Sequence, residues 1–261
     1  MSNQSWQSFR EERNRTLPSP HGWLSLSSLQ WLPEASGPLE LVPGYWSADD
    51  GGAQLSAGPQ DGLELVHGGQ AVNGTINAEL EENESLNWVR YGSILIELAK
   101  RGGRYAIRTR DSQAPRLTGF SAVPTFDYDP SFAVVGTFKP YPAPQTREIS
   151  TANPRVPGHT DIVGEISFQL GGQGHTLLAE RSGGGLLLNF YDSSNGQETA
   201  GWRFLSVAAP AENSSAEKGS VQLDFNYALN WPSGFSAYGT CPQPVPENRL
   251  DVPVKAGEKT L

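Results

Sequence analysis

Glycine and proline interrupt this chain so often that long regular elements have little room. Its 261 residues include 29 glycines and 20 prolines, and no fixed period separates them. This distribution favours many tight turns over a collagen-like repeat. Between Leu39 and Asp111, short apolar runs recur roughly every ten residues, which is typical of β-sandwiches and β-barrels. We therefore predict an all-β protein with mostly antiparallel strands, folded as a sandwich or a barrel.

The two ends of the chain depart from this strand pattern. Near the N-terminus, Trp6, Phe9 and Arg13 recur at helical spacing among good helix formers, so we expect one short helix there. Residues 221–261 begin as an alternating strand and continue into a proline-rich segment whose aromatic and polar residues are too varied for a flexible linker. We expect this segment to be an ordered, irregular strap laid over the β scaffold.

The composition changes near residues 112–130, where proline and aromatic residues accumulate, and this change indicates a boundary between two packed β subdomains. We expect a lead-in with the helix, a first, sandwich-like subdomain, and a second subdomain with the strap: residues 1–22, 23–120 and 121–261. A polar segment at residues 211–219 is expected to form a surface loop.

The clearest hairpin joins residues 93–99 to residues 104–111 through two glycines, which supply the positive φ of a tight turn. Alternation places three arginines on one face of its second strand: Arg104, Arg108 and Arg110. Three arginines on one face can bind an anionic ligand, but Glu97 and an acidic run lie nearby in the sequence. We therefore expect a solvated, charge-balanced face.

Charge and composition narrow the function classes. The net charge of −9 disfavours a nucleic-acid partner, because that affinity depends on clustered Lys and Arg. The single cysteine, Cys241, excludes an internal disulfide, and no histidine spacing matches a metal-binding motif, so no metal or other cofactor is expected. No signal peptide and no apolar run of the roughly 20 residues that span a bilayer is found. We expect a soluble, cytoplasmic protein without a membrane partner, and its oligomeric state stays open.

Several sequence motifs, spread over nearly the whole chain, are informative together. They are WLSL from Trp23, RYAIRTRD from Arg104, FKPY from Phe138, NFYDSSNGQETAGWRFL from Asn189, DFNYALN from Asp224 and CPQPVPENRLDVPVKAGEK from Cys241. In this combination the chain resembles the uncharacterised domain-of-unknown-function 1684 family. The resemblance implies no established activity. It also implies that Ser233 stands where the family usually has its first cysteine, and Ala200 where it has a tyrosine, so no role is expected for a cysteine pair or for that phenol.

A candidate site is expected where the second-half strands meet the strap. Asp192 ends a predicted strand on the same face as its apolar residues, and Arg203 follows after one hairpin. Because an unpaired buried charge is strongly destabilising, the two should pair. The pair fits a cleft between sheet and strap that binds a small molecule, which can be anionic. It equally fits a clamp that holds the strap through Asn248 and Glu258. The predicted ligand-binding residues are Arg203, Asp192, Asn226, Trp202, Tyr238 and Asn248.

Two other function classes stay open, and the sequence does not decide whether the protein is an enzyme. A metal-independent hydrolase or isomerase would use Arg203 to hold an anionic substrate and a carboxylate as acid or base. The candidate catalytic residues are Asp192, Glu247 and His159, the last expected in a loop. The sandwich-like first half also fits a protein-interaction scaffold, which a large exposed apolar patch would favour.

Overall fold

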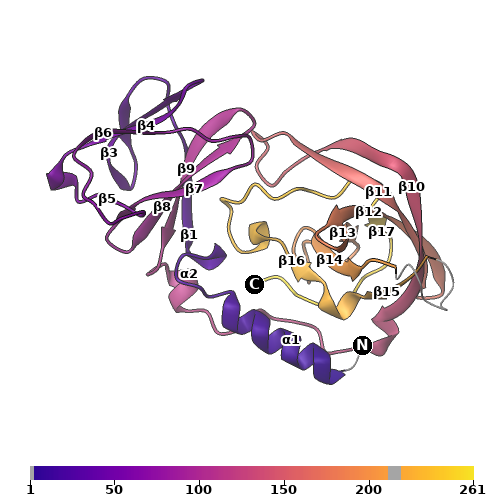
Figure 1. Cartoon of the computed structure of the whole chain (residues 1–261). Coiled ribbons are helices and arrows are strands. Elements are labelled where there is room, and N and C mark those ends of the chain that lie inside the picture. The colour runs from indigo at the N-terminus through magenta and orange to yellow at the C-terminus, as the bar shows by residue number, and fades with distance from the viewer. Residues whose placement is uncertain (1–2, 211–218) are drawn as a thin grey trace. The chain divides into compact units, whose positions relative to one another are not determined.

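The computed structural model describes residues 3–210 and 219–261 (Figure 1). Within them, mostly antiparallel strands form three sheets, and one long helix, α1 (Asn3–Thr16), begins the chain. The predictions of an all-β fold and of an N-terminal helix are confirmed. None of the described helices is long and apolar enough to cross a membrane. The predicted loop at 211–219 lies, apart from its last residue, outside the described residues.

The chain divides into two compact units. The sandwich unit is formed by residues 16–120. The strap unit combines the N-terminal residues up to Arg15 with residues 121–261. Helix α1 is therefore separated in the sequence from nearly all the rest of its unit. The three-part division expected from composition stays a prediction about domain organisation.

The sandwich unit contains a five-stranded and a four-stranded sheet. The first has the order β1 (Leu26–Trp31), β9 (Arg104–Asp111), β8 (Ile94–Arg101), β7 (Ser85–Tyr91) and β5 (Glu64–Leu65). The second has the order β2 (Gly37–Leu39), β3 (Val42–Asp49), β4 (Gly52–Ala57) and β6 (Gly74–Ala78). Its short helices are η1 (Trp23–Ser25), η2 (Pro59–Asp61) and α2 (Pro115–Thr118).

Both sheets of this unit contribute to one apolar core. Trp46 of β3 and Trp88 of β7 meet edge to face with ring centroids 5.8 Å apart. Leu55 of the four-stranded sheet and Ile96 and Ile107 of the five-stranded sheet are fully buried in the same cluster. Aromatic and aliphatic side chains thus pack together between the two sheets.

The hairpin of β8 and β9 forms as predicted, but its arginine face is not solvated. Arg108 and Arg110 are 2% and 8% exposed, and both pair with Glu97, which is 4% exposed. The closest nitrogen–oxygen distances from Glu97 are 3.0 Å to Arg108 and 2.6 Å to Arg110. Arg104 remains exposed and stacks over Trp31. The expectation was wrong because alternation assigns residues to a face without saying whether that face is buried.

Glu97 makes the stability of the sandwich unit depend on pH. Burial alone would raise the pKa of Glu97, but the guanidinium groups of Arg110 and Arg108 outweigh it and hold that pKa below its ordinary value. Because the unfolded pKa is higher, about 4.3, the ion pairs stabilise the fold above that pH, and this stabilisation is lost as the pH falls through the folded pKa. Glu97→Gln is expected to cost about 3–5 kcal/mol near neutral pH, because it leaves two buried guanidinium groups without their anion. Thermal unfolding across a pH series should show that the difference in Tm between variant and wild type shrinks in acid. A Tm difference that stays constant with pH would contradict this account.

The strap unit is built on one large sheet. Its strand order is β15 (Ser220–Asp224), β10 (Ala133–Ile149), β11 (Gly158–Leu170), β12 (Gln173–Ser182), β13 (Gly185–Asp192), β14 (Arg203–Ala208) and β16 (Leu229–Asn230). The short strand β17 (Arg249–Leu250) pairs with β13 and is parallel to it. Its short helices are η3 (Pro130–Phe132), η4 (Phe225–Tyr227) and η5 (Pro232–Gly234).

This sheet curls around a second apolar core. Its first strand, β15, also contacts β14 near the other end of the sheet. Phe168 of β11, Phe190 of β13 and Phe225 of η4 are buried in the core, and the ring of Phe225 lies 5.7 and 5.5 Å from the other two. The curled sheet explains how residues from distant strands come to face the same strap.

The proline-rich part of the expected segment, residues 231–261, forms the strap; it crosses the end of β10 and then runs beside β13. Ala152 donates its backbone N–H to Cys241 at 2.8 Å, and Gln243 donates its own to Ser150 at 2.9 Å. Prolines at 242, 244 and 246 lack an N–H group, so the strap cannot form a regular ladder over this length. Side-chain hydrogen bonds must therefore supply much of what fastens it to the sheet.

Helix α1 packs on the strap unit through aromatic residues and two arginines. Its Trp6 ring lies 5.9 Å from Tyr128, and its Phe9 ring lies 4.8 Å from Tyr227. Arg10 and Arg13 each place a guanidinium nitrogen 3.0 Å from the same carboxylate oxygen of a buried strap residue, Glu258. The helix and the C-terminal end of the strap are thus joined by ion pairs.

Candidate functional site

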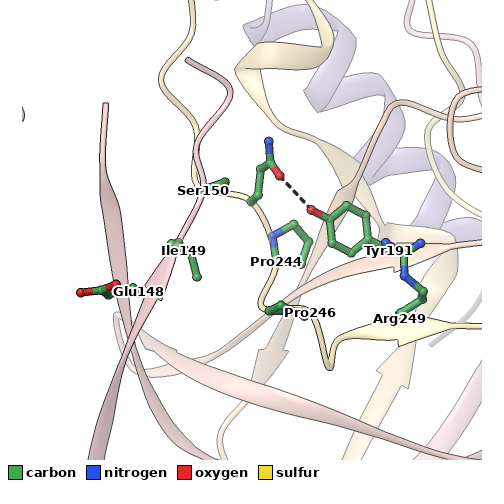
Figure 2. A pocket seen from close by; sticks show the side chains of 8 residues that line it. Glu148, Ile149, Ser150, Tyr191, Pro244, Pro246 and Arg249 are labelled. Carbon is green, nitrogen blue, oxygen red and sulfur yellow. Dashed lines mark hydrogen bonds between the residues drawn. The ribbon is translucent and has the colours of Figure 1, made fainter. Parts of the chain in front are cut away.

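The strap and the sheet of the strap unit enclose a cleft of about 440 Å³ (Figure 2). In this view Pro244 and Pro246 of the strap stand between Ile149 on one side and Tyr191 on the other. The lining residues are Glu148, Ile149, Ser150, Tyr191, Gln243, Pro244, Pro246 and Arg249. The volume lies within the usual range of small-molecule sites, roughly 300–1,000 Å³.

The register of β17 on β13 brings the two largest lining side chains together. Tyr191 is paired with Arg249, and Asp192 with Leu250. Successive residues of a strand point to opposite faces, and here Asp192 and Leu250 are buried while Arg249 is exposed. The Arg249 guanidinium lies over the Tyr191 ring, 4.5 Å from its centroid. This stacking holds the cation at the wall of the cleft.

Tyr191 is held in place by the strap. Its hydroxyl donates to Oε1 of Gln243 at 3.0 Å, and Nε2 of Gln243 donates to the backbone carbonyl of Thr151 at 3.1 Å. Burial raises the pKa of Tyr191, and the charge of Arg249 opposes that effect. The phenol therefore stays protonated near neutral pH and acts as a hydrogen-bond donor.

Arg249 is a cation without a local counter-charge. Among residues 3–210 and 219–261, no carboxylate oxygen lies within 4.0 Å of its guanidinium. The described arginines of the buried networks, such as Arg203 and Arg110, all have such a partner. Arg249 thus presents hydrogen-bond donors in the cleft, and no described carboxylate of the protein neutralises its positive charge.

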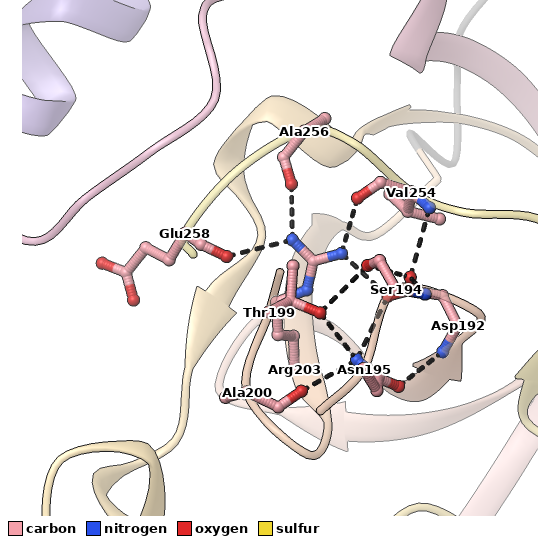
Figure 3. A network of polar contacts seen from close by, with 9 residues as sticks. All are labelled: Asp192, Ser194, Asn195, Thr199, Ala200, Arg203, Val254, Ala256 and Glu258. Carbon is pink, nitrogen blue, oxygen red and sulfur yellow. Dashed lines mark hydrogen bonds and ion pairs between the residues drawn. The ribbon is translucent and has the colours of Figure 1, made fainter. Parts of the chain in front are cut away.

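Asp192 and Arg203, the centre of the predicted site, form a buried ion pair (Figure 3). Asp192 ends β13 and Arg203 begins the adjacent β14, so the hairpin brings their side chains together. Nη2 of Arg203 lies 2.8 Å from Oδ2 of Asp192. Asp192 is 2% exposed and Arg203 is 0% exposed. Burial lowers the pKa of Arg203, while the charge of Asp192 opposes that shift.

The same pair binds the strap. Figure 3 shows the Arg203 guanidinium among the carbonyl groups of Val254, Ala256 and Glu258. Its Nη2 donates to Val254 at 2.8 Å, and its Nη1 donates to Ala256 and, at 3.2 Å, to Glu258. In return, the backbone N–H of Val254 donates to Oδ1 of Asp192 at 3.2 Å. The ion pair thus supplies both donors and an acceptor to the last part of the strap.

The loop between β13 and β14 completes this network. The backbone N–H of Ser194 donates to Oδ1 of Asp192 at 2.8 Å, and its hydroxyl donates to the same oxygen. Asn195 donates through Nδ2 to the Thr199 hydroxyl at 3.0 Å and to the Ala200 carbonyl at 2.9 Å. The Ser194 hydroxyl also lies 3.0 Å from the Thr199 hydroxyl, so the loop and the ion pair form one connected network.

Asn248 uses its side chain to join two strands to the strap. Its amide donates to the carbonyls of Leu178 on β12 and Asn189 on β13, at 2.9 and 2.8 Å, and its Oδ1 accepts from the N–H of Leu178 at 2.7 Å. These strands pair only at their far end, between residues 180–182 and 185–187. Asn248, 1% exposed, bridges the part where they separate.

Asn226 also uses its side-chain amide to join separate segments of the strap unit. Its Nδ2 donates to the Asp129 carbonyl and to Oδ1 of Asp224, both at 2.8 Å, and its Oδ1 accepts from the N–H of Asp129 at 3.0 Å. Its own backbone carbonyl accepts from the Trp6 indole at 2.9 Å. Asn226 is 1% exposed, and its hydrogen-bonding groups contact the segment before η3 and helix α1.

The remaining predicted site residues are dispersed. Trp202 is half-buried next to Arg203, and Tyr238 is 39% exposed on the strap. Glu247 is exposed in the turn before β17. His159 is exposed but lies on β11 rather than in the expected loop, opposite Glu148 of β10. The loop assignment was wrong because the antiparallel pairing of β10 and β11 extends to Gly158 and so includes His159.

None of the predicted ligand-binding residues lines the cleft, but two of them adjoin lining residues in the sequence. Tyr191 precedes Asp192, and Arg249 follows Asn248. Sequence reasoning selected the inward members of these pairs because burial of polar groups is the stronger signal. The outward neighbours were detectable only through the pairing of β17 with β13, which has no local pattern. Among the described residues, no group of three or more His, Cys, Asp and Glu is placed to hold a metal ion.

A family model confirms the family resemblance expected from the sequence. The model of the family described as "Protein of unknown function (DUF1684)" matches residues 118–259. A solved structure, an uncharacterised protein of Haloarcula marismortui determined by NMR in solution, is similar to this chain at 26% identity. The similarity covers 55% of this chain and 78% of that one, with a TM-score of 0.45. No curated protein matches the chain.

Proposed function

Because this chain belongs to the DUF1684 family of proteins of unknown function, and the matched residues include the strap and the cleft, we propose a function from the cleft itself. The cleft binds a small molecule that carries an anionic group. The observation that carries this proposal is Arg249, a cation that lines the cleft and has no carboxylate partner among the described residues. Anions are the natural complement of such a guanidinium.

The surroundings of Arg249 support a preformed site. The Tyr191 ring restrains the guanidinium by stacking, and Gln243 restrains that ring through its hydroxyl. Pro244 and Pro246 fix the backbone of the opposing strap segment. A site whose groups are already ordered binds with a smaller loss of entropy.

In this proposal Asp192, Arg203 and Asn248 act as a clamp rather than as ligand-binding groups. Their complete burial and their bonds to the strap support this role. The clamp fixes β17 against β13 and so sets the distance between the two walls of the cleft. Arg203, being inaccessible, offers the hydrolase or isomerase alternative no group to hold a substrate.

Arg249→Met is expected to weaken binding of small anions without loss of stability. A charge-assisted hydrogen bond contributes about 1.5–3 kcal/mol, so affinity should fall at least about tenfold. The measurement is a titration of the full chain, labelled with ¹⁵N, with acetate, benzoate, citrate and inorganic phosphate, following the amide signals of Tyr191, Gln243 and Arg249.

Arg155→Met is the matched control, because Arg155 is another exposed arginine of the same unit and does not line the cleft. It should titrate like the wild type. Signals that move elsewhere in the chain, or affinities equal in the Arg249 and Arg155 variants, would overturn the proposal.

A further inference from the structure

We infer that the cleft selects a carboxylate on an apolar body and discriminates against phosphate esters. This inference rests on the proposed function and names the class of ligand. It follows from three features of the lining: the number of cations, the state of the backbone N–H groups, and the chemistry of the walls.

The cleft offers one positive charge. Of its eight lining residues, Arg249 is the cation and Glu148 the anion. In Figure 2 the Glu148 carboxylate points away from Tyr191, so it lies at the outer edge and adds negative potential there. A carboxylate carries one charge and matches the planar fork of a single guanidinium. A phosphate ester carries about −1.5 to −2 near pH 7, and its second charge would find no cation.

The backbone of the strap and of Tyr191 does not supply the missing donors. Phosphate sites commonly use a set of backbone N–H groups at a loop or a helix N-terminus. Here the N–H of Gln243 donates to Ser150, that of Tyr191 to Asn248 and that of Arg249 to Glu247, at 2.9, 2.8 and 2.9 Å. Pro244 and Pro246 have no N–H at all. The strap segment therefore presents a wall that is poor in donors.

The walls favour an apolar body on the ligand. Ile149, Pro244, Pro246 and the ring of Tyr191 all line the cleft. Figure 2 places the prolines between the isoleucine and the tyrosine. An aromatic or short aliphatic group would lie against these side chains while its carboxylate reaches the Arg249 guanidinium. A ligand with both ends makes the charge-assisted hydrogen bond and the apolar contact together, so it binds more tightly than a ligand with either end alone.

Four probes that differ in one feature each test the inference on the full chain. They are phenylacetate, phenyl phosphate, 2-phenylacetamide and acetate, titrated by calorimetry and by amide chemical shifts. Phenylacetate is expected to bind at least about tenfold more tightly than each of the others. Acetate lacks the apolar contact, 2-phenylacetamide lacks the charge-assisted hydrogen bond, and phenyl phosphate carries a second charge without a cation. Ile149→Ser should weaken phenylacetate and leave acetate nearly unchanged, and Arg155→Met should leave both unchanged.

The outcomes separate this inference from the proposed function. If phenyl phosphate binds in the cleft as tightly as phenylacetate and depends on Arg249, the ligand class is wrong and the anion site stands. If 2-phenylacetamide binds as tightly as phenylacetate, the Arg249 guanidinium does not recognise the anion, and both the inference and the proposed function are overturned. If no probe shifts the signals of Tyr191, Gln243 or Arg249 at millimolar concentration, both are likewise overturned.

Discussion

Replacing Arg203 by methionine is expected to be among the most destabilising single changes in the strap unit. The side chain is completely buried, and its loss leaves the Asp192 carboxylate buried without its counter-charge. The carbonyls of Val254 and Ala256 lose their donors at the same time. Breaking a buried ion pair from one side costs about 3–5 kcal/mol, which for a chain of this size lowers Tm by on the order of 10 °C. Differential scanning calorimetry of wild type and variant measures the effect.

Two further variants distinguish a clamp from general damage to the core. Adding Asp192→Asn to Arg203→Met removes the orphaned charge, so the double variant should be more stable than the single one. Arg249→Met changes an exposed arginine of the same unit and should leave Tm nearly unchanged. A single variant as stable as wild type would show that the pair does not hold the strap.

Replacing Glu258 by glutamine is expected to release helix α1. Glu258 is 0% exposed, and its carboxylate accepts from Arg10 and Arg13 of the helix and, at 2.7 Å, from the backbone N–H of Asn230. The amide keeps the volume but removes the charge, leaving Arg10, 6% exposed, without its anion. The expected loss is again about 3–5 kcal/mol. Hydrogen exchange of residues 3–16 should accelerate more than that of β10 or β11.

Glu12→Gln is the control for this second prediction. Glu12 and Arg15 also form an ion pair on α1, at 2.6 Å, but their side chains are 58% and 72% exposed. An exposed pair contributes at most about 1 kcal/mol, so this variant should exchange like the wild type. If Glu258→Gln leaves the hydrogen exchange of α1 unchanged and accelerates that of β16, the prediction is wrong. The carboxylate would then stabilise the backbone at Asn230, and the aromatic contacts of Trp6 and Phe9 would hold the helix.

Local patterns were sufficient for the fold class. Frequent glycine and proline disfavour helices over most of the chain, and period-2 alternation between turns gives strands, so the all-β class and the hairpin of β8 and β9 could be predicted. Trp6, Phe9 and Arg13 on one face were sufficient for α1. The pairing of Asp192 with Arg203 was also predictable, because a buried charge on one strand of a hairpin requires an opposite charge on its neighbour.

Burial was not predictable from the same patterns. Alternation placed Arg108 and Arg110 together on one face, and their pairing with Glu97 follows from the cross-strand register. Whether that face is exposed depends on what packs over the sheet, which is a property of the whole fold. The solvated face expected from the sequence was therefore wrong, although each residue was assigned to the correct strand.

The cleft was decided by tertiary structure for a related reason. By itself the sequence determined a β scaffold, an N-terminal helix and an irregular strap, each from short-range rules of turn, alternation and helical spacing. The strap has no periodic pattern, because its prolines prevent a regular ladder and single side chains such as Asn248, Arg203 and Glu258 fasten it at separate points. Its register on β13, which places Arg249 over Tyr191, arises only when all these contacts are made together.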